Sequence, residues 1–156
     1  MKHLPKILSF LEKLAVAIFI GAAISWQLNI EGASILIALS LGTLACVYFL
    51  RVYIPSDIKI AEGEQLGFQE LLVMQILPRV LGISMAVAII GIQFFLLGLE
   101  GYATMIAVGG STIAVASFIA GVLRISGTRY SETLVPTLFR ALIILVVVVV
   151  LALQQG

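Results

Sequence analysis

Long apolar runs separated by short polar segments dominate the hydrophobic pattern of this chain of 156 residues. A helix needs about 20 apolar residues to cross the roughly 30 Å hydrocarbon core of a bilayer. The first and last runs are slightly short, and each extends past a cation, Lys13 or Arg140, whose long side chain can reach the headgroups. The pattern therefore predicts five membrane-spanning helices, from five charge-free runs that cover residues 14–30, 32–50, 80–99, 101–123 and 141–156.

The turn between the first two runs occurs again between the third and fourth. A shift of 69 positions places residues 28–32 on residues 97–101, and both segments end in Glu-Gly. Each copy predicts an apolar helix, a tight turn and a second apolar helix. We therefore expect an all-α, polytopic membrane helical bundle, built from a tandem parallel repeat of two hairpins plus one closing helix.

This organisation makes residues 1–156 a single membrane domain with one sizeable polar connection. The stretch before Pro78 mixes apolar residues with glutamine and glutamate. Such a stretch can lie along the membrane interface as an amphipathic helix, or it can lengthen the third span by two turns. The expected parts are hairpin 1 (about 8–53), an inner loop or interfacial segment (54–79), hairpin 2 (about 80–124) and a final helix (about 134–154).

Composition agrees with a membrane protein and excludes several other classes. Hydrophobic residues make up 62% of the chain and charged residues 11%, whereas soluble domains carry about 25% charged residues. The net charge of +1 gives no indication of nucleic-acid binding. Cys46 is the only cysteine, which excludes an intrachain disulfide and a cysteine-based metal cage.

The positions of the cations predict the orientation. If the N-terminus is cytoplasmic, all nine lysines and arginines fall in the inner segments 1–13, 51–79 and 124–140. Short cytoplasmic segments of membrane proteins are enriched in lysine and arginine. We therefore expect the N-terminus in the cytoplasm and the C-terminus outside.

Candidate chemistry is sparse. All eight acids fall at the ends of the runs or in loops, so no ionisable residue is expected deep within a span. No His, Cys or carboxylate cluster has metal-ligand spacing, and no nucleophile motif or phosphate-binding glycine loop is present. We expect neither an enzyme nor a cofactor nor a metal site.

Uncharged polar residues within the spans allow two interpretations. They can line a polar path for a solute, or they can form hydrogen bonds between helices, each worth about 0.6 kcal/mol. The candidates for such a path are Gln27, Gln93, Thr43 and Thr112.

Small residues recur at four-residue spacing and predict faces on which helices pack closely. The fourth span has small residues on more than one face, which is typical of a central helix or one shared with a partner. The candidate packing residues are Gly21, Ala38, Gly42, Gly109, Gly110 and Ser111.

Residues 21–24, 31–36 and 43–45 resemble the transmembrane hairpin of the small motor subunit of the Bacteroidetes gliding and type 9 secretion machinery, and related uncharacterised small membrane proteins of that phylum. The resemblance implies a hairpin architecture and a bacterial inner membrane. The family carries His-Trp-Pro-Gly in the turn and a glutamate in the second helix. Residues 29–32 and Leu44 differ from both motifs, so motor function is not implied.

These observations favour a non-enzymatic integral membrane protein of the bacterial inner membrane. Its expected partners are the lipid bilayer and other membrane subunits or further copies of itself, so that it serves as a structural or accessory subunit. The alternative is a small transporter or channel component that uses the polar residues within its spans.

Overall fold

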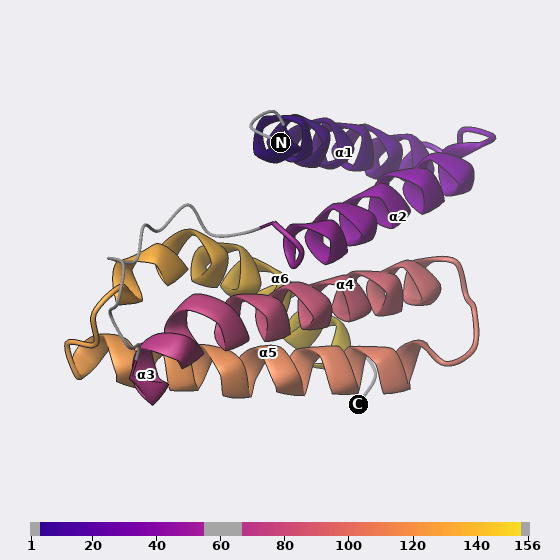
Figure 1. Ribbon diagram of the computed structural model, residues 1–156. Helices are drawn as coiled ribbons and strands as arrows, with labels where there is room; N and C mark the ends of the chain where they lie inside the picture. The colour runs from indigo at the N-terminus through magenta and orange to yellow at the C-terminus, as the bar shows by residue number, and fades with distance from the viewer. Residues whose placement is uncertain (1–3, 55–66, 154–156) are drawn as a thin grey trace.

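The computed structural model describes residues 4–54 and 67–153, and every regular element in these ranges is helical (Figure 1). This confirms the all-α class. The elements are α1 (Leu4–Gln27), α2 (Ala33–Arg51), α3 (Phe68–Leu71), the π-helical turn η1 (Leu72–Ile76), α4 (Leu77–Leu96), α5 (Tyr102–Ile125), the 3-10 turn η2 (Ser131–Leu134) and α6 (Val135–Leu153).

Five helical segments of the described chain are long and apolar enough to cross a bilayer, as the sequence predicted. Three of them are the single helices α1, α2 and α5. The third span is a continuous run of 29 residues in which α3, η1 and α4 follow one another without a break. The fifth span joins η2 to α6. The helices alternate in direction, so the bundle is an up-and-down arrangement.

The stretch before Pro78 lengthens the third span instead of forming a separate helix. The run begins at Phe68, and Val73 and Met74 within it are buried against the bundle. The preceding part of the inner loop, residues 55–66, lies outside the described residues, as do residues 1–3 and 154–156.

Pro78 explains the wider helical turn that precedes it. Proline has no backbone N–H, and its ring collides with the carbonyl group four residues earlier in a regular α-helix. Here the N–H of Leu77 donates to the carbonyl of Leu72, five residues back. This local widening is typical of π-helical turns within α-helices. It lets the third span continue through the proline.

The two hairpin turns have the same backbone conformation. Gly32 has φ 86° and ψ −4°, and Gly101 has φ 86° and ψ −5°. Asn29 and Gly98, also equivalent in the repeat, have φ values of 53° and 66°. Glycine adopts this left-handed region without steric cost, and asparagine tolerates it. The 69-residue repeat is therefore present in the backbone as well as in the sequence.

The central helix of the described bundle is α4, which packs against α2, α5 and α6. Figure 1 shows α1 and α2 on one side of α4, and it shows α5 on the opposite side of α4. Both hairpin turns lie at the same end. The sequence suggested that the fourth span is either central or shared with a partner. The central position belongs to the third span, whose apolar side chains are buried on several faces, while α5 packs against α4 and α6.

Two adjacent glycines let α5 approach two neighbours at once. A Cβ atom added to Gly109 would lie 2.7 Å from the backbone nitrogen of Ala88 in α4. A Cβ atom added to Gly110 would lie 2.7 Å from Cγ1 of Val148 in α6. Consecutive residues of a helix point about 100° apart, so these two positions face different neighbours.

Candidate functional site

Glu12 is the only charged residue that is buried in the described part of the chain. It lies about two turns inside α1, since the helix already includes Leu4. Leu8 and Ala15, one turn to either side, are also buried, so Glu12 belongs to the face of α1 that packs into the bundle. The sequence placed Glu12 at the end of a span and did not identify it as buried, because the charge-free run starts only at residue 14.

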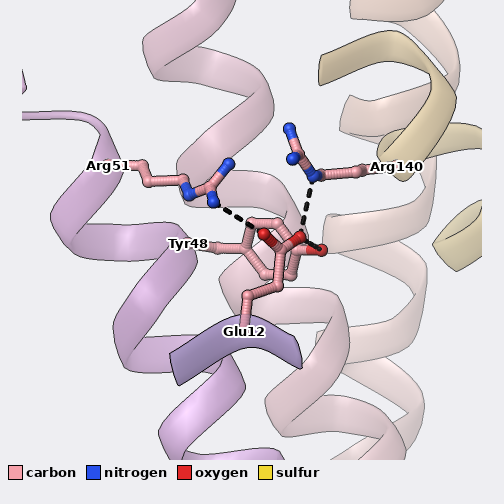
Figure 2. A network of polar contacts seen from close by, with 4 residues as sticks. All are labelled: Glu12, Tyr48, Arg51 and Arg140. Atoms are coloured by element: carbon pink, nitrogen blue, oxygen red, sulfur yellow. Dashed lines mark hydrogen bonds and ion pairs between the residues drawn. The ribbon is translucent and has the colours of Figure 1, made fainter. Parts of the chain in front are cut away.

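Three side chains from two other helices contact the Glu12 carboxylate (Figure 2). Arg51 Nη2 lies 2.6 Å from Oε2, and Arg140 Nε lies 2.7 Å from Oε1. The Tyr48 hydroxyl donates a hydrogen bond of 3.0 Å to Oε1. We call these four residues the Glu12 network; it connects α1 to α2 and α6.

The direction of the helices explains why these residues meet. Tyr48 and Arg51 lie three residues apart on one face of the last turn of α2, and Arg140 lies in the second turn of α6. Alternating helices bring the beginning of α1, the end of α2 and the beginning of α6 to the same end of the bundle. Arg140 therefore forms an ion pair within the protein, a contact that the sequence did not predict for this flanking cation.

The Glu12 network is a paired charge cluster and not an isolated acid. Both carboxylate oxygens contact a guanidinium group, and the side chain of Glu12 is 12% exposed. Removing one partner of a buried ion pair costs about 3–5 kcal/mol, because the remaining charge loses its compensation. The network therefore constrains how the first hairpin sits against α6.

The repeat contains the signal that could have revealed this site. The 69-residue shift that aligns the turns places Glu12 on Leu81, which is fully buried in α4. It also places Arg51 on Ala120, which is buried in α5. Glu12 and Arg51 thus occupy positions at which the second hairpin has buried apolar residues. A charged pair at such positions indicates a polar contact that faces into the bundle. Arg140 lies outside the repeat, so no sequence pattern pointed to it.

The four candidates for a polar path form no hydrogen bond with one another. The hydroxyl groups of Thr43 and Thr112 donate to the carbonyls of Leu39 and Val108, each at 2.7 Å and within its own helix. Gln27 is exposed at the end of α1. Gln93 points toward α2, with Oε1 3.9 Å from the position of a Cβ atom on Gly42.

The candidate packing residues fall into two groups. Gly109 and Gly110 are buried at the close contacts of α5 described above. The others are not at such close contacts: Gly21 is exposed with no atom within 4 Å of an added Cβ, Ala38 and Gly42 are half-buried, and Ser111 is exposed with its hydroxyl donating to the Val108 carbonyl.

A lateral apolar groove of about 540 Å³ lies between α2 and α4. Gly42 and Cys46 contribute to its α2 wall, and Ile83 and Ala86 contribute to its α4 wall. Small side chains on α2 leave this space open. Cys46 is exposed there.

The described residues contain no group of three or more His, Cys, Asp or Glu side chains that could hold a metal ion. Comparisons of the chain with protein-family models, with curated proteins and with solved structures found no match.

Proposed function

We propose that this protein is a non-enzymatic structural or accessory subunit of a membrane assembly, formed with further copies of itself or with other membrane proteins. The observation that supports this most directly is the Glu12 network. Its one buried carboxylate is compensated by two guanidinium groups and a hydroxyl, so its polar atoms hold helices together. Both oxygens of this carboxylate are engaged by side chains of α2 and α6, so the contacts connect three helices.

Four hydroxyl groups elsewhere in the spans support the same proposal. The hydroxyl groups of Ser40 and Ser84, both buried, donate to carbonyls of their own helices. Thr43 and Thr112 do the same at exposed or half-buried positions. Hydroxyl groups bonded in this way are satisfied without a solute or a water file. This arrangement weighs against the alternative of a small transporter or channel component.

The groove between α2 and α4 supports assembly with another helix. Its walls are apolar, and Gly42 and Cys46 give α2 a smooth surface there. Small residues on a lipid-facing surface let a neighbouring helix approach closely, which favours association in membranes. We propose this groove as the face through which the subunit packs.

The proposed location is a bacterial inner membrane, with the N-terminus in the cytoplasm and the C-terminus outside. The distribution of lysine and arginine supports this orientation. The resemblance of the first hairpin to the gliding and secretion motor subunit supports this type of membrane. Leu44 stands where that family has its glutamate, and this difference supports an accessory role in place of a motor role.

The test is purification from the native membrane in a mild detergent, followed by native mass spectrometry. We expect a homo-oligomer or a complex with a partner at fixed stoichiometry. A second measurement uses the single cysteine: if two copies meet at the groove, a short bis-maleimide should link Cys46 of one copy to Cys46 of another in intact membranes, and the Cys46→Ala variant should give no linked product.

A matched pair of substitutions then locates the packing face. Gly42→Leu fills the groove, whereas Gly121→Leu makes the same change on α5 at a position with no atom within 4 Å of an added Cβ. We expect Gly42→Leu to reduce assembly while Gly121→Leu leaves it unchanged. A monomer that transports a solute into liposomes, and loses transport in Gln93→Leu, would contradict the proposal.

A further inference from the structure

The two arginines of the Glu12 network retain most of their hydrogen-bonding capacity. A guanidinium group has five N–H donors in a planar fork. Glu12 contacts Nη2 of Arg51 and Nε of Arg140. Among the described residues, neither guanidinium group has another hydrogen-bond or ion-pair partner. Each therefore has donors available for a ligand.

Figure 2 shows the two guanidinium groups on either side of the carboxylate, with nitrogen atoms of both on the side away from the α1 backbone. Glu12 contacts each group through a different oxygen, so it holds the groups apart and sets their orientation. The free donors of two separate helices thus face one region. The two guanidinium groups thus flank the Glu12 carboxylate and carry available donors on the same side of it.

The charge of the Glu12 network also favours an anion. Two guanidinium groups oppose one carboxylate, which leaves a net charge of +1 when Tyr48 is neutral. The side chains of Arg51 and Arg140 are 24% and 30% exposed, so the available donors lie at the rim of the bundle. Both arginines belong to the end of the bundle that carries the other basic residues of the described chain.

We infer that Arg51 and Arg140 bind an anionic phosphoryl group, with Glu12 as the residue that positions both guanidinium groups. Planar guanidinium forks match the oxygen geometry of phosphate and bind it through two parallel hydrogen bonds. Basic pockets between transmembrane helices at the cytoplasmic side bind phospholipid headgroups. The same chemistry could be supplied by a soluble phosphate, and the test separates the two sources. The inference does not depend on the proposed subunit function.

The experiment uses the full chain, purified and depleted of lipid, and measures bound phospholipid by native mass spectrometry. The probes are phosphatidylglycerol, phosphatidylcholine and inorganic phosphate, each added separately. We expect the wild type to retain phosphatidylglycerol more strongly than phosphatidylcholine. If inorganic phosphate displaces the lipid or raises the melting temperature without lipid, the site also accepts a soluble phosphoryl group.

The informative variant is Arg51→Lys with Arg140→Lys, because lysine keeps the charge that compensates Glu12 but lacks the planar fork. We expect its affinity for phosphatidylglycerol to fall roughly tenfold. If the double variant fails to fold, Arg140→Lys alone serves as the test, because it preserves the pair between Arg51 and Glu12. Its loss of affinity for phosphatidylglycerol should be smaller. Arg79→Gln removes an exposed cation of the third span and should leave binding unchanged. Equal retention of both lipids, or the same affinity in the lysine variants, would overturn the inference.

Discussion

Glu12 and Leu81 are equivalent residues of the internal repeat, and both are buried although only one of them is charged. Leu81 is fully buried in α4, and Glu12 is 9% exposed in α1. A second pair of equivalent residues differs in the same way: Arg51 of the first hairpin is charged, and Ala120 of the second hairpin is apolar and buried. The first hairpin thus uses a polar contact where the second uses apolar packing. The first hairpin reaches α6 through the ion pair of Glu12 with Arg140, whereas the helices of the second hairpin pack directly against α6.

The first prediction concerns the Glu12 network. Glu12→Leu should reduce the free energy of unfolding by about 3 kcal/mol, because it leaves Arg51 and Arg140 without a compensating charge. We expect the lower end of the usual range, since both arginines are partly exposed and can move toward the headgroups. The measurement is denaturation by SDS in mixed micelles, followed by circular dichroism.

A compensated variant serves as the control for this prediction. Replacing Glu12, Arg51 and Arg140 together by Leu, Ala and Leu copies the apolar pattern of the second hairpin at the first two positions. An apolar replacement of a whole buried ion pair is often neutral or stabilising. We therefore expect the triple variant to recover most of the stability lost in Glu12→Leu. Equal stability of Glu12→Leu and the wild type would show that the network contributes nothing.

The second prediction concerns the repeated turn. Gly32→Ala and Gly101→Ala should each destabilise the protein by about 1–2 kcal/mol, because both residues have a φ of 86° that disfavours a Cβ atom. The two losses should be similar, since neither position has an atom within 4 Å of the new Cβ. Gly21→Ala is the control: this helical glycine also has open space, and alanine should stabilise it by about 0.5–1 kcal/mol. Unequal losses at the two turns would contradict their equivalence.

The third prediction compares two adjacent glycines of α5. Gly109→Ala places a Cβ atom against the backbone of Ala88, whereas Gly110→Ala places one against a side-chain atom of Val148. A valine side chain can shift more readily than a helix backbone, so Gly109→Ala should cost more. We expect a loss of about 1–3 kcal/mol for Gly109→Ala and less for Gly110→Ala. Thermal unfolding in detergent measures both, and the reverse order would show that α4 yields more easily than α6.

The fourth prediction concerns orientation. Glu31 and Glu100 are exposed in the two hairpin turns, which lie at the same end of the bundle (Figure 1). In a Cys46→Ser background, Glu31→Cys and Glu100→Cys should both react with a membrane-impermeant maleimide added to intact spheroplasts. Arg129→Cys, in the connection between α5 and α6, should react only after permeabilisation. Labelling of the two turns from opposite sides would exclude the five-span arrangement.

The backbone architecture could be predicted from the sequence because its causes are local. Charge-free runs of membrane-spanning length must form helices in lipid, where every backbone polar group needs an internal partner. The Glu-Gly turns were recognisable because the left-handed conformation at Gly32 and Gly101 restricts which residues can occupy them. The alternation of five spans then followed from the positions of lysine and arginine.

The Glu12 network and the central place of α4 depend on contacts between residues that are distant along the chain. Three helical spans lie between the helices of Glu12 and Arg140 along the chain, and their ion pair exists only because α1 and α6 begin at the same end of one bundle. Composition and spacing describe each helix separately and do not specify which helices become neighbours. Side-chain packing determines which helices become neighbours, through close approaches such as Gly109 against Ala88. The same packing buries Glu12, a charged residue near the start of the first span.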